Sequence, residues 1–447
     1  MNFKSKDFYK NLALFLLIIL LLLQASYLWL RFSIPKKSDE GDFKSHDLSV
    51  EVFMPVSLVV NLGPKEHYML NNFKNYWRAY ARDISEIMLN VRSENVVLIS
   101  PEEYLSLQDQ KSLVFKFSSP LSGSILINLM GEEKLDNNIN ISVSSIYISR
   151  ENEVYIGGSN NYYRLTGLKT NLNIQRLLDS APERGKNYLN FKEVFGINKD
   201  LLIPDSSFIE SQRIYYEPSI NEIDESIKNN LAIRFLGSDL DAIREIKEFD
   251  KTSYIFENKY LSFNSNSILE FSDEKLIDIG DRNLYSSIVT SLKFLSKNSG
   301  MYQKIYLDKI EPLDFQHSKG YKFYYNFKES GKNLVFNSKD GAFIEMEVFS
   351  DHVKSYREFY YKKSQDPNYM PVNIKILRID DVVSENLPYL EGTDPMEILK
   401  NISDLNIVYM TEDLYEATSL NLAYELTYAN KKFYFDISNG KLLLIRW

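Results

Sequence analysis

The sequence predicts an α+β protein in which an N-terminal transmembrane helix precedes a multidomain, β-rich extracytoplasmic body with antiparallel sheets and amphipathic helices. Three observations carry this prediction. A continuous apolar run near the N-terminus is long enough to cross a membrane. The chain of 447 residues contains 31 Tyr and 27 Phe, and aromatic side chains favour half-buried strands. Several later segments alternate apolar and polar side chains, as strands with one buried face do.

The transmembrane prediction rests on residues 12–30, LALFLLIILLLLQASYLWL. At about 1.5 Å per residue, a helix of this length crosses a hydrocarbon core of roughly 30 Å. A cleavable signal peptide has a shorter apolar core, of about 7–15 residues, followed by a small-x-small cleavage site. Leu23-Gln24-Ala25 offers no such site. Because soluble cores rarely need so continuous an apolar run, we predict a permanent anchor.

The orientation of this helix follows from what surrounds it. Basic residues flank both ends, so charge does not decide the orientation. No later segment is long and apolar enough to return across the membrane, and a short tail before a long apolar helix is typical of a signal anchor. We therefore expect a single-pass protein of the cell membrane, with its N-terminus cytoplasmic and its C-terminal body extracytoplasmic.

Gln24 is the strongly polar side chain within the apolar run. An amide in hydrocarbon gains about 0.6–2 kcal/mol by hydrogen bonding to another transmembrane helix. The alternative is that Gln24 lies close enough to the outer interface to reach water. A spacing of four, four and three places one set of side chains on a single helix face, and we predict that this face contacts a partner helix. The candidate face comprises Leu16, Leu20, Gln24 and Tyr27.

The first part of the body is predicted to be β-rich with one long helix. Apolar residues recur at spacings of three and four from Phe73 to Met88, which predicts an amphipathic helix with one face on the core. Short runs rich in β-branched and aromatic residues, separated by polar turns, predict strands around this helix. The expected strands cover residues 50–62, 96–99, 113–117, 124–129, 139–148 and 154–156.

The later part of the body alternates helices and strands. Residues 238–246 and 284–295 have the pattern of amphipathic helices, the second ending before Gly300, and residues 253–271 are strand-like between them. Tyr321 to Phe327 alternates apolar and polar side chains, as a half-buried strand does. Asp394-Pro395 opens a further helix, since Asp suits the N-cap and Pro the first helical position. The tail forms a meander around the Asn439-Gly440 turn.

Polar, proline-bearing segments mark the predicted borders between units. A chain of this length has room for about three globular units once the N-terminal segment is set aside. The predicted organisation is a cytoplasmic tail at 1–11, a transmembrane helix at 12–30, a linker at 31–47, an N-terminal α+β domain at 48–205, a central α+β domain at 206–363 and a C-terminal α+β domain at 364–447.

Composition excludes several function classes. A net charge of -9 argues against a nucleic-acid partner, because phosphate binding needs clustered Lys and Arg. The absence of cysteine removes disulfides, thiolate nucleophiles and zinc-thiolate sites, and an exported body without cysteine is typical of a bacterium. Motifs for nucleophile elbows, zinc proteases, dinucleotide binding and phosphate-binding loops are all missing. We predict that the chain is not an enzyme and needs no cofactor or metal.

Isolated histidines and acidic pairs do not change this prediction. Each lone histidine is expected in a surface or capping role, since the spacing predicts no shared metal. Acidic pairs arise by chance among 61 acidic residues and are expected in solvated caps and turns. The histidines are His46, His67, His317 and His352, and the pairs are Glu132/Glu133, Asp239/Asp241 and Asp380/Asp381.

Four segments follow one another between Leu231 and Phe349, and they read LAIRFLGSDLDAIREI, TSYIFENKYLSFNSNSILEFSD, LYSSIVTSLKFLSKNSGMYQKIYLDKI and GYKFYYNFKESGKNLVF. Their order and spacing resemble the central domain of the YycH family of Gram-positive two-component regulatory proteins. This is where the similarity to the family is densest. Three upstream segments, VFMPVSLVVNL, SLVFKFSSPLSG and ISVSSIYISRENEVYIGGSNNYYRL, resemble the family's first domain. Ser355-Tyr356-Arg357 and the tail segment LAYELTYANKKFYFD resemble its later segments. The chain departs from the family pattern near Met301 and Ala423, where Trp is expected.

The resemblance implies that the chain regulates an essential WalK (YycG) sensor histidine kinase. This kinase belongs to a two-component system of cell wall homeostasis. The implied contacts are with the kinase and with a YycI-like single-pass membrane protein, and family members carry no known catalytic residues. Two alternatives remain open. An anchored envelope module that binds a peptide or a cell-wall ligand would have a ligand-sized pocket lined by Tyr and Trp. An envelope enzyme would have a buried, convergent cluster of carboxylates or histidines.

Overall fold

The computed structural model describes residues 50–70, 73–127, 141–158, 161–167, 172–212, 215–218, 225–265, 267–275, 278–299, 305–337, 341–363, 371–411 and 418–446. These residues belong to one compact unit. The predicted tail, transmembrane helix and linker lie outside the described ranges. Inside those ranges, no helix combines the length and the apolar character needed to cross a membrane.

The first sheet is antiparallel and contains nine of the described strands. Their spatial order is β3-β7-β6-β5-β4-β1-β2-β8-β9, so the chain folds back repeatedly on its neighbours. The strands are β1 (Ser57–Gly63), β2 (Glu66–Leu70), β3 (Val96–Ile99), β4 (Ser112–Ser122), β5 (Ser142–Ser149), β6 (Val154–Gly157), β7 (Tyr162–Leu165), β8 (Lys186–Asn190) and β9 (Leu202–Pro204).

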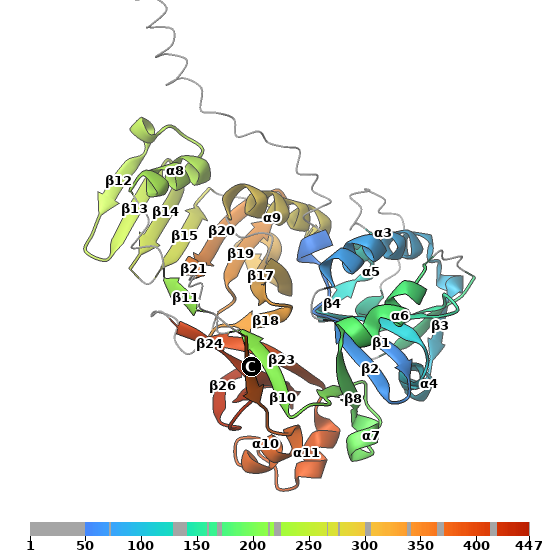
Figure 1. The fold of residues 1–447 in the computed structure, drawn as a ribbon. Helices are drawn as coiled ribbons and strands as arrows, with labels where there is room; N and C mark the ends of the chain where they lie inside the picture. The colour runs from blue at the N-terminus through green and yellow to red at the C-terminus, as the bar shows by residue number, and fades with distance from the viewer. Residues whose placement is uncertain are drawn as a thin grey trace, which may run out of the picture. The chain divides into compact units, whose positions relative to one another are not determined.

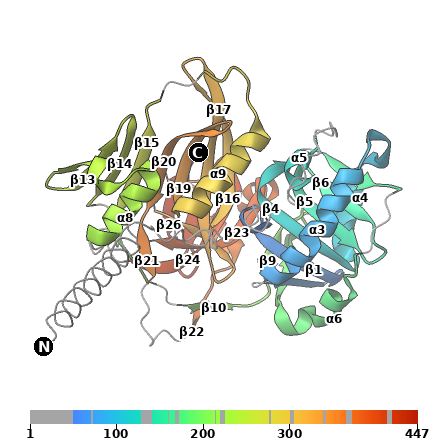
Figure 2. The same ribbon diagram turned by 90° about the horizontal axis from the view of Figure 1, so that it is seen from above.

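Helices pack on both faces of this sheet. The long helix α3 (Lys74–Asn90) confirms the amphipathic prediction, since Trp77 is fully buried and its ring lies 5.5 Å from that of Phe115 on β4. Figure 2 shows α3 extended along the sheet. The other helical segments are η1 (Ser93–Asn95), α4 (Pro101–Ser106), η2 (Leu107–Asp109), α5 (Gly123–Ile127), α6 (Gln175–Arg184) and α7 (Phe191–Phe195).

Two predicted strands in this region differ from the structure. Residues 50–52 are helical, so the strand expected at 50–62 begins only at Ser57. Residues 124–129 were expected to extend, and α5 occupies Gly123–Ile127 instead. Ile125, Leu126 and Ile127 are all buried, whereas a half-buried strand would expose every second side chain. A short apolar run does not distinguish a buried helix from a buried strand, and here the packing of α5 against α3 decides.

The second sheet contains fifteen of the described strands. Its main path is β12-β13-β14-β15-β20-β19-β17-β18-β23-β24-β11-β21, with β16 beside β17, β25 beside β24 and β26 beside β25. Among these described strands, every pair is antiparallel except β18 with β23. The strands are β11 (Tyr215–Pro218), β12 (Arg244–Lys247), β13 (Lys251–Phe256), β14 (Lys259–Asn264), β15 (Ile268–Asp273), β16 (Ile305–Phe315), β17 (Ser318–Glu329), β18 (Lys332–Val335), β19 (Ile344–Phe349), β20 (His352–Phe359), β21 (Tyr361–Lys363), β23 (Asp404–Thr411), β24 (Thr418–Tyr428), β25 (Lys431–Asp436) and β26 (Leu442–Arg446).

Two helices cover one face of the β12 to β17 half of this sheet. Figure 1 shows α8 (Glu225–Leu236) and α9 (Leu284–Asn298) lying across the strands, and α8 contacts β13 and β14 while α9 contacts β17, β19 and β20. The buried row beneath them runs from strand to strand through matched positions. It comprises Leu261, Phe271, Tyr356, Met346 and Phe323.

The helix expected at residues 238–246 is also wrong. The chain there makes a single 3-10 turn, η5 (Leu240–Ala242), and then strand β12. Gly237, with φ +72°, ends α8 just before this segment, because a left-handed residue after a helix satisfies its last carbonyls. Pairing of β12 with β13 then overrides the helical spacing of the apolar residues.

Other predictions of the later body are confirmed. Residues 253–271 form strands, α9 ends at Asn298, and β17 buries Phe323, Tyr325 and Phe327. The tail forms the β24-β25-β26 meander with Gly440 at φ +70°. Helix α11 (Pro395–Asn401) begins after Asp394, whose carboxylate accepts a hydrogen bond from the amide of Met396. Helix α10 (Ile379–Glu385) precedes it.

The predicted domain borders stay predictions. A small sheet pairs β10 (Phe208–Gln212) with β22 (Pro371–Lys375), which joins segments from either side of the border drawn at 363/364. The pair β18-β23 also crosses that border. In the described body, the central and C-terminal segments therefore share one continuous sheet.

Candidate functional site

The predicted site residues divide into those outside and those inside the described ranges. Leu16, Leu20, Gln24 and Tyr27 lie outside, together with His46 and Glu132/Glu133. Inside, Asp239 and Asp241 are exposed around η5, as expected for a solvated turn. Asp380 and Asp381 lie in the first turn of α10. Among the described residues, no three His, Asp or Glu side chains are placed to share a metal ion.

His67 contradicts the expected surface role of a lone histidine. His67 is fully buried on β2, where Nδ1 lies 2.8 Å from Oδ1 of Asn61 and Nε2 lies 3.1 Å from the carbonyl of Pro64. Asn190, also buried, lies 3.1 Å from Nε2. Burial lowers the pKa of His67, so the imidazole is a neutral part of the core. Nothing in the spacing identified these partners before the sheet brought them together.

The face of the second sheet opposite α8 and α9 is polar. Two cross-strand rows of side chains run across it, each with one residue from each strand. Because side chains alternate between faces along a strand, both rows point away from the helix-covered core. The first row is Ser253, Ser262, Glu270, Arg357, Glu345 and Tyr324, and the second is Ile255, Tyr260, Ser272, Ser355, Glu347 and Lys322.

A hollow of about 460 Å³ lies over these rows and is the candidate binding site of the body. Cavities that hold small ligands measure about 300–1,000 Å³, so the hollow is ligand-sized. Its lining includes Lys251, Tyr260, Lys322 and Arg357, and no Trp. The sequence did not indicate this site, because its residues come from strands far apart in the chain.

Glu345 and Arg357 lie opposite each other on neighbouring strands in the lining of the hollow. Lys322 Nζ lies 2.8 Å from one carboxylate oxygen of Glu345, while Arg357 Nη1 is 3.9 Å from the other. That second oxygen, Oε1, and Nε of Arg357 are both buried without a hydrogen-bond partner among the described residues. Buried polar atoms normally have partners, so this donor and acceptor are an exception within the lining of the hollow.

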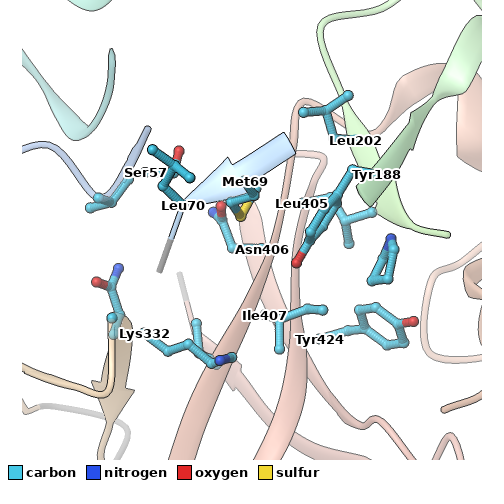
Figure 3. Close-up of a pocket in the computed structure, with 15 residues that line it drawn as sticks. Ser57, Met69, Leu70, Tyr188, Leu202, Lys332, Leu405, Asn406, Ile407 and Tyr424 are labelled. Atoms are coloured by element: carbon cyan, nitrogen blue, oxygen red, sulfur yellow. The ribbon is translucent and has the colours of Figure 1, made fainter. Parts of the chain in front are cut away.

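A second cavity lies between the two large sheets. Figure 3 shows its lining from β1, β2, β8, β9, β18, β23 and β24, with the Tyr188 side chain directed into it. Burial lowers the pKa of Lys332, on its wall, to about 8. The cavity measures only about 50 Å³, room for one or two waters. It is therefore too small for a peptide or a wall fragment, and we take the larger hollow as the candidate site.

This chain is similar to known proteins in its structure, whereas its sequence matches none of those compared. No family model matches this chain, and no curated protein matches it. Its structure is similar to that of YycH from Bacillus subtilis, with a TM-score of 0.54 and 13% identity over 88% of this chain and 96% of that chain. The chain has a YycH-like fold. At this identity the similarity shows the fold alone.

Two further solved structures are more distant. An uncharacterised protein from Eubacterium rectale has a TM-score of 0.35 and 10% identity, covering 60% of this chain and 98% of that chain. The Bacillus megaterium YpeB C-terminal domain has a TM-score of 0.30 and 15% identity, covering 50% of this chain and 96% of that chain. Neither similarity is close enough to support an argument about this protein.

Proposed function

We propose that this chain is a membrane-anchored, non-catalytic regulator of a WalK/YycG-type sensor histidine kinase, acting together with a YycI-like single-pass membrane protein. The observation that carries the proposal is the YycH-like fold, which extends over 88% of the chain. The ordered segments between Leu231 and Phe349 support the same family from sequence.

The proposed mechanism is a bias on a two-state kinase. A helix that packs differently against the two signalling states shifts their populations by its differential affinity. A coupling of about 1–3 kcal/mol changes the equilibrium constant between the two signalling states by roughly 5-fold to 150-fold. On this proposal the face of Leu16, Leu20, Gln24 and Tyr27 contacts the kinase within the membrane, and the extracytoplasmic body makes further contacts.

Cysteine crosslinking tests the membrane contact, because the native chain contains no cysteine. Single cysteines at Leu16 and Gln24 in the full chain, in native membranes, should form adducts with the kinase when the kinase carries a cysteine in its own membrane span. Ile18 and Leu22 provide matched controls, since a helical period of about 3.6 residues places them on the opposite face. Equal capture from both faces, or capture from neither, would argue against the proposal.

The hollow over the second sheet favours a second candidate function, an envelope binding module for a peptide or cell-wall ligand. A peptide group supplies both a hydrogen-bond acceptor and a donor, and the hollow is lined by cationic side chains such as Lys251 and Arg357 and by carboxylates such as Glu270. The hollow is also large enough for such a ligand. Tyr260 lines it, although the Trp expected of such a pocket is missing.

Binding of a defined probe separates the two functions. A soluble muropeptide and its sugar-free peptide can be titrated into the full chain in detergent by calorimetry. The binding-module hypothesis requires saturable binding that Arg357→Met weakens at least tenfold, while Phe249→Ser, a change at a fully exposed residue, leaves it unchanged. Kinase capture without muropeptide binding supports the regulator, and muropeptide binding without kinase capture supports the module.

A further inference from the structure

The edge strand β3 differs from the other edges of the described sheets. Edge strands expose unpaired N–H and C=O groups, and proteins usually protect them with charges, prolines or bulges. Strand β3 reads Val-Val-Leu-Ile and has none of these. The strand β12, equally short, carries Arg244, Glu245 and Lys247. Among edges whose side chains are described, Pro204 lies on β9, Pro312 and a bulge on β16, Arg446 on β26 and Glu210 on β10.

Strand β3 exposes apolar side chains on both of its faces. Val96 packs on the main core and Ile99 on a small aromatic cluster, so the two faces of the strand meet different cores. Leu98, on the face of Val96, is 65% exposed, and Val97, on the face of Ile99, is 45% exposed. A helix or a flat surface placed against one face would cover only one of them. An added strand covers both, because its own side chains alternate between the two faces.

The backbone of β3 shows which groups an added strand would meet. The carbonyl of Asn95 accepts a hydrogen bond from the amide of Thr166, next to the β3-β7 pair, so it faces β7. Antiparallel strands alternate hydrogen-bonded and non-hydrogen-bonded pairs. Val97 and Ile99 therefore bond to β7, while Val96 and Leu98 direct their N–H and C=O groups outward. No described strand pairs with that side.

We propose that β3 pairs antiparallel with β3 of a second copy of this chain, about a twofold axis through Val97. In this register Val96 and Leu98 of one copy exchange backbone hydrogen bonds with Leu98 and Val96 of the other. Val97 faces Val97 across a non-hydrogen-bonded pair. This interface does not depend on the proposed regulator function.

The residues around β3 fit a second copy as the occupant. A four-residue, uncharged, β-branched strand is matched by another strand of the same kind, and the register brings no like charges opposite each other within it. Antiparallel pairing also brings the turn η1 before one strand towards the helix α4 after the other. Arg92 at the N-cap of η1 then supplies a charge opposite to those of Glu102 and Glu103 in the first turn of α4, while Glu94 in η1 has the same sign as they do.

Disulfide formation tests this pairing, again using the cysteine-free native chain. In a non-hydrogen-bonded pair the Cα atoms lie about 4.5 Å apart, within the roughly 4.4–6.8 Å that a disulfide spans. Val97→Cys in the full chain, purified in detergent and mildly oxidised, should give a covalent dimer on a non-reducing gel. Phe249→Cys, on a fully exposed tip between β12 and β13, is the control for random collisions and should stay monomeric.

A second substitution separates pairing from misfolding. Leu98→Pro in the Val97→Cys background removes an outward N–H and keeps the bonds of Val97 and Ile99 to β7. The disulfide should then be lost while the thermal midpoint stays within a few degrees. Absence of the Val97→Cys disulfide overturns the proposal, even if the membrane helix holds the chain in a dimer. Capture of a different protein by Val97→Cys in native membranes overturns it as well.

Discussion

The two large sheets bury ionisable side chains in different ways. In the first, His67 lies among Asn61, Pro64 and Asn190, and burial lowers its pKa so that it is neutral. In the second, Glu358 is 3% exposed, and burial raises its pKa to about 7, although hydrogen bonds from Tyr356 and Ser299 oppose that rise. The first sheet buries a group in its uncharged form, whereas the second buries one that changes charge near neutral pH.

The surroundings of Glu358 explain why its pKa lies near neutral pH. Arg234 on α8 donates from Nη2 to the carbonyl of Asn298 at 2.8 Å, and its Nε has no partner among the described residues. The charge of Arg234 acts on Glu358 from a distance and lowers its pKa less than burial raises it. The partners of His67 thus favour its neutral form, whereas the hydrogen bonds to Glu358 favour the carboxylate that burial disfavours.

The largest expected effect is in the first sheet. Trp77→Ala should lower the free energy of unfolding by about 3–5 kcal/mol, because it empties the space beside Phe115 and Phe117. It also removes the hydrogen bond of 2.7 Å from Nε1 to the carbonyl of Val50. Urea unfolding followed by far-UV circular dichroism measures the change. Trp77→Phe keeps most of the volume and should cost less than half as much; equal costs would mean that volume does not dominate.

Next in size is the pH response of the second sheet. A glutamate side chain ordinarily has a pKa of 4.5, and burial raises the pKa of Glu358 to about 7, so the folded state binds the extra proton. Stability from this group is complete below pH 4.5 and is lost as the pH rises to about 7, a change of roughly 3 kcal/mol. Glu358→Gln should remove that loss, seen as a smaller difference in unfolding free energy between about pH 5 and about pH 7.5.

Tyr356→Phe sharpens this test. The phenol donates a hydrogen bond of 2.6 Å to Oε2 of Glu358, which favours the carboxylate. Without it the pKa of Glu358 should rise further, and the loss of stability should extend to higher pH. If both variants keep the pH profile of the native chain, another group is responsible for the response.

The first sheet should respond to pH in the opposite sense. The folded-state pKa of His67 lies below its ordinary 6.5, so its contribution is present above pH 6.5 and is lost as the pH falls below it. His67→Leu should cost about 2 kcal/mol at pH 8, because Asn61 and Asn190 lose a buried partner. The cost should shrink on acidification, as thermal unfolding at about pH 8 and about pH 5.5 would reveal. A cost that grows on acidification would contradict a neutral imidazole.

The sequence predicted those parts of both regions in which the local pattern and the packing agree. Helix α3 with Trp77, helix α9, and the β24 to β26 tail follow their periodicity and turn residues. The helix prediction for residues 238–246 failed because the spacing of Ile243 and Ile246 also suits a helix. Only pairing with β13 makes residues 244–247 a strand. The α+β class depended on the first kind of signal and is confirmed for the described body.

The candidate sites depend on contacts that no local pattern contains. Glu270, Arg357 and Glu345 become neighbours only when β15, β20 and β19 pair, although residues 270 and 357 are far apart in sequence. Likewise, Asn61 and Asn190 meet His67 through two strand pairings. A single charged residue carries no sign of such partners, so the sequence interpretation of the lone histidines failed at His67. Likewise, the position of β3 at the edge of its sheet follows only from the order of the strands, which the sequence does not contain.

The smallest expected loss of stability comes from removing a helix N-cap, and one such cap can be compared in each region. Exposed Asp394 caps α11 with one hydrogen bond of 2.9 Å to the amide of Met396, whereas buried Asn190 caps α7 and also contacts His67. Asp394→Ala should cost about 1 kcal/mol, the usual value of an N-cap, and Asp394→Asn should restore nearly all of it. Asn190→Ala should cost more, since it also leaves a buried group unpaired. Equal losses in denaturant unfolding would show that the Asn190–His67 contact adds nothing to the cap.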